Sequence, residues 1–349
     1  MKSKAAIHIE HNKKLVIDEI NIPNPKDNQV VVRLFSSGVC HSQLHQMHNI
    51  DTPTPTLLGH EGFGIVTNVG KSVTHLQEGD AAIVTWVPRE PISGRWFPPS
   101  GGATWNGKQL SGATATWSED VIVWSGYVVK VMDDAPKDLT SIVGCAVLTG
   151  AGAVTHTAKV RPEESVAVFG VGGVGISAIQ MASILEAYPI IAVDLDDSKL
   201  DFAKQFGATH VINAKKDDPV KKIIEITNGG ADYCFDAIGL RITNEQILPA
   251  TRGGGSGADN IGGMAVLIGM PGKEMTIDPG HFMYHQRQYR GSLGATYPEK
   301  DFNMYIRLHN EGKFPLNKLV TKRYKLDEIN DACDDLENGR IFGRAIIEY

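Results

Sequence analysis

Two cysteines and one histidine in the first half of the chain offer the donor atoms that zinc prefers, thiolate sulfur and imidazole nitrogen. They are Cys40, His60 and Cys145, which stand 20 and 85 residues apart. Three such ligands leave a fourth position open on a tetrahedral zinc, as in a catalytic site. The separations follow no spacing rule, however. Taken singly, each cysteine could equally be a small buried apolar side chain, and His60 an ordinary polar one.

A glycine-rich hexapeptide, Gly170-Val171-Gly172-Gly173-Val174-Gly175, follows an apolar run and opens a segment of helical character. In this context the G-x-G-x-x-G pattern predicts a dinucleotide site. The glycines allow a tight turn, a close approach of the backbone to a pyrophosphate, and close packing of helix on strand. The phosphates would lie at the helix N-terminus. Without that context, the glycines could simply form a turn.

Asp194 stands 19 residues after the last glycine of this motif, at the end of the next apolar run. A carboxylate there would accept hydrogen bonds from ribose hydroxyls and repel a 2′-phosphate, which favours NAD over NADP. Lys199 follows closely enough to soften that repulsion. Considered alone, Asp194 could be a solvated carboxylate at a strand end.

Strands and helices alternate regularly on either side of Asp194, a pattern that predicts a doubly wound parallel sheet. The expected strands are 166–169, 190–193, 211–212, 233–235 and 265–268, and the expected helices are 175–186, 198–206 and 219–227.

The first 150 residues have a different rhythm, with short runs rich in Val and Ile that are separated by Gly, Pro and Asp. This pattern indicates an irregular, mostly antiparallel β domain. The clearest runs are 30–34, 65–69, 82–87 and 121–123. After about Leu293 the sequence predicts helices near 302–308 and 326–336 and a strand at 345–347. We expect this tail to return to the first domain.

The composition limits the class of protein. A chain of 349 residues is long enough for two domains with separate cores. A formal net charge of -6, with Lys and Arg scattered, argues against a nucleic-acid partner. The sequence has neither a signal-peptide run nor a stretch of roughly 18 apolar residues, so we expect a cytoplasmic protein with no membrane association. Four widely separated cysteines do not suggest a disulfide framework.

Several segments together resemble the zinc-containing alcohol dehydrogenases of the medium-chain dehydrogenase/reductase family, and the resemblance runs over most of the chain. They are 38–42, 59–62, 79–80, 144–145 with 149–150, the glycine motif, Asp194, 266–271 and 343–344. The resemblance implies an α/β fold, with a Rossmann doubly wound parallel sheet and a mostly antiparallel, GroES-like catalytic domain. The catalytic, zinc-binding domain would comprise residues 1–146 and 294–349, and the dinucleotide-binding domain residues 147–293.

The activity implied by this resemblance is hydride transfer between NAD(H) and an alcohol paired with its aldehyde or ketone. Cys40, His60 and Cys145 would hold one catalytic zinc, a Lewis acid that stabilises an alkoxide. Glu61 would be an acid able to approach the metal from behind.

Two further residues would handle the hydroxyl proton. Ser42 would hydrogen-bond the substrate oxygen. His45 would exchange the relayed proton with solvent, a task that suits an imidazole near neutral pH.

The resemblance also implies cofactor contacts outside the glycine motif and one pocket residue. His41 and Arg344 would lie near the pyrophosphate. The other implied contacts are Thr149, Lys199 and Ile268. Trp86 would stand in the substrate pocket and favour small or slender substrates, although it could equally be core packing.

The chain departs from many such relatives at one point. Those relatives carry a structural zinc on four closely spaced cysteines, whereas no cysteine lies between Asp80 and Ser141 here. We therefore expect one catalytic zinc per chain and no structural zinc. The interval contains a segment, 88–118, rich in Gly, Pro, Ser and Thr. We interpret it as a long loop that packs its aromatic residues on the chain itself or on a neighbouring subunit; those residues are Trp96, Phe97, Trp105 and Trp117.

Two other functions are compatible with parts of the pattern. One is a metal-free NAD(P)H-dependent quinone or enoyl reductase of the same superfamily, which would lack the Cys, His-Glu and Cys set. The other is a cofactor-binding protein without catalysis, which would have lost ligands or the proton relay. For the zinc enzyme we expect a small-molecule alcohol or aldehyde substrate and a homodimer or homotetramer.

Overall fold

The computed structural model describes residues 1–92 and 99–349, so Trp96 and Phe97 lie outside the described residues. The chain forms two compact units. Unit 1 comprises Met1–Cys145 and Tyr297–Tyr349, and unit 2 comprises Ala146–Thr296. Within the described ranges, no helix combines the length and apolar character needed to cross a membrane.

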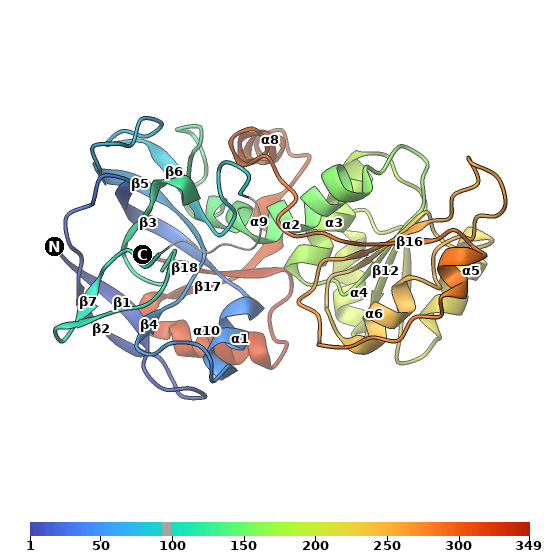
Figure 1. The fold of residues 1–349 in the computed structure, drawn as a ribbon, viewed down its shortest axis with the longest axis horizontal. Helices are drawn as coiled ribbons and strands as arrows, with labels where there is room; N and C mark the ends of the chain where they lie inside the picture. Colours follow the sequence, from blue (N-terminus) through green and yellow to red (C-terminus); the bar gives the residue numbers. More distant parts are fainter. Residues whose placement is uncertain (93–98) are drawn as a thin grey trace. The chain divides into compact units, whose positions relative to one another are not determined.

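Unit 2, whose residues are all described, is built on a parallel sheet with the strand order β13-β12-β11-β14-β15-β16. This is the order of a Rossmann fold, which confirms the predicted doubly wound sheet. The strands are β11 (Val166–Phe169), β12 (Ile190–Asp194), β13 (His210–Asn213), β14 (Tyr233–Asp236), β15 (Met264–Leu267) and β16 (Gln288–Gly291). Figure 1 shows these strands among the helices of the unit.

The helices of unit 2 alternate with its strands. They are α2 (Ala146–Gly152), the π-helical turn η3 (Ala153–Ala158), α3 (Gly173–Ile184), α4 (Asp197–Lys204), α5 (Pro219–Thr227), α6 (Arg241–Ile247) and α7 (Gly280–Met283). Helix α5 matches its predicted range because its end signals are local. The Asp218 side chain accepts from the Val220 and Lys221 N–H groups, Pro219 opens the helix, and Asn228 closes it in the left-handed conformation.

Unit 1 contains the β-rich half of the chain, in which two sheets run β4-β1-β2-β7-β8 and β10-β6-β5-β3-β18-β17, with β9 also pairing with β3. The strands are β1 (Lys2–His8), β2 (Val16–Asn21), β3 (Gln29–Val39), β4 (Thr56–Leu57), β5 (Glu61–Val69), β6 (Ala81–Thr85), β7 (Thr104–Trp105), β8 (Lys108–Gln109), β9 (Asp120–Trp124), β10 (Val128–Lys130), β17 (Val320–Lys325) and β18 (Arg344–Glu348). All the pairs except β17 with β18 are antiparallel, as expected.

The helices of unit 1 are short, apart from α8. They are α1 (His41–His48), η1 (Ser125–Tyr127), η2 (Thr140–Gly144), α8 (Pro298–Asn310), α9 (Leu316–Leu319), η4 (Leu326–Glu328) and α10 (Ile329–Glu337). The C-terminal segment returns to this unit, because β18 pairs antiparallel with β3. Buried side chains from both ends of the chain share one hydrophobic cluster, which includes Val39, Leu44, Ile329 and Ile347.

The segment 88–118 is not wholly a loop, which corrects our interpretation. Strands β7 and β8 form a short hairpin inside it, and β7 pairs with β2. The indole N–H of Trp105 donates to Asp18 Oδ2 at 2.8 Å. Trp117 is 1% exposed, and its indole N–H donates to the Gly38 carbonyl at 3.1 Å. The two described tryptophans of this segment, Trp105 and Trp117, are therefore held by hydrogen bonds to unit 1 of the same chain.

Candidate metal centre and dinucleotide platform

Strand β3 brings Cys40 to the candidate metal centre. Its last residue is Val39, and Cys40 follows in an extended conformation as the N-cap of α1. Val39 lies opposite Ala345 in the β3–β18 ladder. This register places the start of β18, and with it Arg344, beside Cys40.

His60 and Glu61 reach the same place from the next strand. Glu61 is the first residue of β5 and pairs with Thr85 at the end of β6. Ser37 of β3 lies opposite Gly62 of β5, so the ends of β3 and β5 are neighbours. Cys40 and His60, which are 20 positions apart in the chain, are thus brought into one site by antiparallel pairing.

Cys145 comes from a third element, the turn that follows η2. The hydroxyl of Thr85 donates to the Gly144 carbonyl at 2.7 Å, which ties this turn to the end of β6. Because Thr85 also pairs with Glu61, one residue links the second and third segments of the site.

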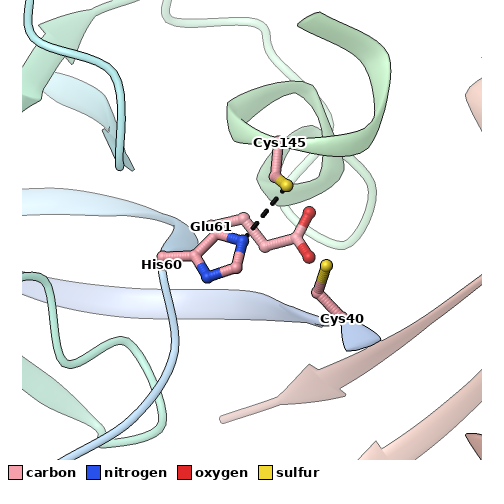
Figure 2. Close-up of side chains that lie close together, drawn as sticks. All are labelled: Cys40, His60, Glu61 and Cys145. Atoms are coloured by element: carbon pink, nitrogen blue, oxygen red, sulfur yellow. Dashed lines mark hydrogen bonds between the residues drawn. The ribbon is translucent and has the colours of Figure 1, made fainter. Parts of the chain in front are cut away.

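The four side chains converge: one possible ligand atom each from Cys40, His60, Glu61 and Cys145 lies within 4.8 Å of all the others. Figure 2 shows the two sulfurs, the imidazole and the carboxylate facing a common centre. His60 Nε2 lies 3.1 Å from Cys145 Sγ. Donors around a tetrahedral zinc lie roughly 3.3–3.8 Å apart, given Zn–S and Zn–N bonds of about 2.3 and 2.1 Å. The donor types are those that zinc prefers, and the four donor atoms lie close enough together to share one ion.

The surroundings of Cys40 favour its thiolate form, which is the form that binds metal. The pKa of this thiol is held well below its usual range, chiefly by the hydrogen bond from Cys145. The positive charge of Arg344 and the contact with His60 act in the same direction, whereas burial opposes them.

Glu61 and Arg344 form an ion pair inside the site. Glu61 is fully buried and Arg344 is 5% exposed, and the guanidinium donates to Glu61 Oε1. The other oxygen, Oε2, is buried and has no hydrogen-bond partner among the residues that the structure describes. A Cβ atom on Gly38 would lie 2.3 Å from Glu61 Cδ, so Gly38 leaves the room that this side chain occupies. Arg344, whose guanidinium we expected near the pyrophosphate, is therefore paired with Glu61 in this structure.

Gln43 is a site residue that our sequence reasoning missed. Its side-chain amide contacts His60 Nδ1, the ring nitrogen on the far side from Cys145. Gln43 is 1% exposed, and its Oε1 has no hydrogen-bond partner among the described residues. Rotating the amide by half a turn would let Oε1 accept from an Nδ1–H, and amide oxygen and nitrogen are assigned from such networks. The position of Gln43, three residues after Cys40 on α1, was the available signal.

The other residues of unit 1 that we predicted for the site follow Cys40 on α1 or lie at the end of β6. Ser42 Oγ is 3.6 Å from Cys40 Sγ. His45 is exposed one helical turn after Ser42 on α1, and His41 is exposed at the start of that helix. Trp86 directly follows β6; it is half-buried, and its indole N–H has no hydrogen-bond partner within residues 1–92 and 99–349.

The glycine motif of unit 2 adopts the predicted strand-turn-helix arrangement. Gly170 follows β11 with a φ of +87°, and α3 begins at Gly173. A Cβ on Gly175 would lie 1.8 Å from the Gly170 carbonyl oxygen, so helix and turn pack closely. A Cβ on Gly172 would meet nothing within 4 Å, which leaves the backbone there open to a ligand.

The other predicted cofactor residues of unit 2 are arranged around this turn. Asp194 ends β12, and its carboxylate accepts from the N–H groups of Val171 and Leu195 at 3.0 and 2.7 Å. Lys199 is half-buried on α4, and Ile268 is half-buried just after β15. Thr149 on α2 has a buried hydroxyl with no hydrogen-bond partner in the described ranges. The open backbone at Gly172 and the hydroxyl of Thr149 could both contact a bound dinucleotide.

Comparisons with known proteins agree with this arrangement. Residues 26–133 match the family profile of the alcohol dehydrogenase GroES-like domain, and residues 173–311 match that of the zinc-binding dehydrogenase. The chain is 32% identical to S-(hydroxymethyl)glutathione dehydrogenases from Synechocystis sp. and Escherichia coli, and each alignment covers 100% of both chains.

Solved structures give the same result. An alcohol dehydrogenase zinc-binding domain protein from Burkholderia ambifaria has a TM-score of 0.92 and 31% identity, with 100% of this chain and 99% of that chain covered. Benzyl alcohol dehydrogenase from Acinetobacter calcoaceticus has a TM-score of 0.88 and 30% identity over the same shares. With its two matching domains and its Cys, His, Glu and Cys cluster, the chain is a zinc-dependent alcohol oxidoreductase and belongs to the zinc-containing alcohol dehydrogenases of the medium-chain dehydrogenase/reductase family.

Proposed function

We propose that this protein is an NAD-linked alcohol dehydrogenase with one catalytic zinc per chain, held by Cys40, His60 and Cys145. The observation that carries the proposal is the convergence of their donor atoms within 4.8 Å from three separate elements. Zinc bound there would polarise the substrate oxygen as a Lewis acid, in either direction of the reaction.

The charges of the site support a divalent cation. Two thiolates supply two negative charges, while Glu61 and Arg344 offset each other in the buried pair described above. A charge of +2 therefore leaves the centre neutral, which matters because an uncompensated buried charge is costly.

Ser42 and His45 are proposed to carry the hydroxyl proton. They lie three residues apart on α1, so they share one helix face. The Ser42 hydroxyl can accept a proton from the substrate hydroxyl while it donates its own. His45 is exposed and can pass that proton to solvent.

Unit 2 is proposed to bind the cofactor and unit 1 to hold the catalytic zinc. The glycine turn and the N-terminus of α3 would receive the pyrophosphate, with further contacts from His41, Thr149, Lys199, Ile268 and Arg344. The carboxylate of Asp194 is oriented by three backbone N–H groups, those of Val171, Leu195 and Asp196. It would accept from the ribose hydroxyls and repel a 2′-phosphate, which makes NAD the proposed cofactor.

A single zinc per chain is consistent with the surroundings of the other cysteines. Cys234 is fully buried on β14, and Cys333 is 5% exposed on α10, each within a hydrophobic cluster. Burial raises the pKa of both thiols, which disfavours the thiolate. Across residues 1–92 and 99–349, the cluster around Cys40 is the group found with metal-ligand spacing.

The substrate is proposed to be a small alcohol or aldehyde. Relatives similar to this chain are named for S-(hydroxymethyl)glutathione and for benzyl alcohol. Trp86, which follows the strand end next to Glu61, would narrow the pocket in favour of slender substrates.

We also propose a homodimer or homotetramer. Among the described residues β16 pairs with β15 alone, which leaves one edge of the sheet open. Near this strand in the chain, Met283 at the end of α7 and the following Tyr284 are 76% and 77% exposed. Light scattering on the purified protein measures the assembly, and a monomer would contradict this part.

The main experiment measures zinc content together with nicotinamide absorbance, using NAD(H) and NADP(H) and a panel of small alcohols, benzyl alcohol, S-(hydroxymethyl)glutathione and the matching aldehydes. Cys40→Ser should lose zinc and turnover together, whereas Cys333→Ala, which changes a core cysteine, should keep both. Activity that survives complete zinc removal would contradict the proposal, as would a clear preference for NADP.

A further inference from the structure

Asp236, the last residue of β14, is a buried carboxylate with a full set of hydrogen bonds. It is 0% exposed. Its Oδ1 accepts from the N–H groups of Ile238 and Gly239 at 2.8 and 3.0 Å. Its Oδ2 accepts from the Thr243 hydroxyl at 2.8 Å and from the side-chain amide of Asn244. One oxygen thus holds the loop after β14, and the other is held by α6.

The backbone around Asp236 joins the ends of two neighbouring strands. Its carbonyl oxygen accepts from the N–H groups of Ile268 and Gly269, just after β15, at 2.9 and 2.8 Å. The next residue, Ala237, donates to the Phe169 carbonyl at the end of β11 at 2.9 Å. Three segments at the carboxyl edge of the sheet therefore meet at this residue.

The loop that Asp236 holds lies directly against the glycine motif. A Cβ on Gly170 would come within 2.4 Å of Ile238 Cγ1, so the Ile238 side chain covers the first glycine of the motif. A Cβ on Gly239 would come within 2.2 Å of the Met270 carbonyl oxygen, so the loop also packs against the segment after β15. Ile238 nevertheless remains 40% exposed. A shift of this loop would move the surface beside the glycine turn.

We propose that Asp236 is a positioning residue for the dinucleotide: its carboxylate fixes residues 237–239, and through Ile238 it holds the glycine turn in the shape that receives the pyrophosphate. This inference rests on the proposed binding of NAD to unit 2. Asp236 is buried at the end of its strand and has no contact with the cofactor in this scheme. It therefore differs from Asp194, whose carboxylate is proposed to meet the ribose.

Two substitutions of Asp236 separate positioning from simple loss of packing. Asp236→Ala removes both acceptors and leaves the Ile238 and Gly239 N–H groups unpaired. Asp236→Asn keeps an oxygen for these N–H groups, and its amide can donate to Thr243 and Asn244 once their side chains reverse. Ile223→Val is the matched control, because it trims a fully buried side chain of unit 2 on α5.

The measurements on holoenzyme are NADH affinity by fluorescence, the steady-state constants for NAD, zinc content and thermal midpoint. We expect Asp236→Ala to weaken NADH binding and raise the KM for NAD by at least about tenfold, with zinc content and kcat at saturating NAD largely kept. Asp236→Asn should recover most of the affinity. Ile223→Val, compared at a similar loss of thermal midpoint, should bind NADH normally.

Three results would overturn the inference. Asp236→Ala could bind NADH as tightly as the wild type. Ile223→Val could lose affinity in proportion to its stability, as a purely structural role requires. Asp236→Asn could fail to recover affinity although its thermal midpoint is restored. If the wild-type protein itself binds no NADH, the proposed function fails first, and the two failures are thereby distinguished.

Discussion

The side-chain amide of Gln43 contacts His60 Nδ1, while the opposite ring nitrogen of His60 faces Cys145 Sγ. Such a contact fixes the orientation of a ligating imidazole. Gln43→Leu should therefore lower zinc affinity by about 10- to 100-fold. The measurement is a chelator competition titration. Gln43→Glu, which keeps an acceptor, should lose less, and Gln46→Leu on the exposed side of α1 should match the wild type. Equal zinc affinity in Gln43→Leu and Gln46→Leu would contradict this role.

The buried pair of Glu61 and Arg344 should show strong coupling. Arg344→Met leaves a buried carboxylate without its cation, at a cost of about 3–5 kcal/mol in the free energy of unfolding. Adding Glu61→Gln removes the stranded charge, so the double variant should be more stable than Arg344→Met alone. Denaturant unfolding of the wild type, Arg344→Met, Glu61→Gln and the double variant measures the coupling. Additive effects of the two substitutions would show that the pair does not act as a unit.

The proposed proton relay predicts a pH-dependent defect in alcohol oxidation. His45→Ala should keep its zinc, because the side chain is exposed on α1 and supplies no ligand. Its turnover should fall mainly at lower pH, since hydroxide can replace the imidazole as proton acceptor at higher pH. The pH profile of kcat tests this expectation. His48→Ala is the control, because His48 contacts Asn12 and Glu337. A uniform loss across the pH range would argue against a relay through His45.

Cofactor choice should depend on Asp194. Asp194→Ser removes the carboxylate proposed to meet the ribose and the charge that repels a 2′-phosphate. We expect kcat/KM for NAD to fall by about tenfold or more, because hydrogen bonds to a charged group are lost. We also expect kcat/KM for NADP to rise. Asp201→Asn, on the exposed part of α4, should leave the ratio unchanged. An unchanged preference in Asp194→Ser would place the selectivity elsewhere.

Acid should destabilise the protein partly through His8. This residue is fully buried at the end of β1, and neither ring nitrogen has a hydrogen-bond partner in the part of the chain that the structure describes. Burial lowers its pKa, and the neighbouring His11 and His48 lower it further. The unfolded chain therefore binds a proton below about pH 6.5 that the folded chain resists.

The stability supplied by neutral His8 is present above that pH and lost as the pH falls toward the folded pKa, at up to about 1.4 kcal/mol per pH unit. His8→Leu should flatten this slope, as calorimetry between pH 8 and pH 5 would show. Parallel slopes for the two proteins would exclude His8 as the cause.

The elements with local signals were predictable from sequence. Strand β11 was expected at 166–169 because its four apolar residues stand between Ser165 and Gly170, and parallel strands buried on both faces read as such short apolar runs. Strand β16, Gln288–Gly291, has no apolar run and is largely exposed. Its pairing with β15 comes from the tertiary arrangement, so sequence reasoning did not identify it.

In the candidate site, too, some features were predictable from residue types and others depend on tertiary contacts. The types of Cys40, His60 and Cys145 suggested zinc, but their separations carried no signal, because strand pairing sets their proximity. Gln43 has an unremarkable sequence context and acquires its contact only when β5 brings His60 to α1. The position of Arg344 beside Glu61 likewise depends on the register of β18 against β3.

Strand β18 lies between β3 and β17 in the sheet of unit 1, although all of unit 2 separates it from β3 in the chain. A ribosome releases the chain from the N-terminus at about 5–20 residues per second. Unit 2 can therefore fold while the sheet of unit 1 still lacks the strand that pairs with β3. Until β18 is synthesised, the sheet beside Cys40 lacks one strand, and Glu61 lacks Arg344 as its partner. The order of synthesis therefore makes the pairing of β18 with β3, and the contact of Arg344 with Glu61, late steps in folding.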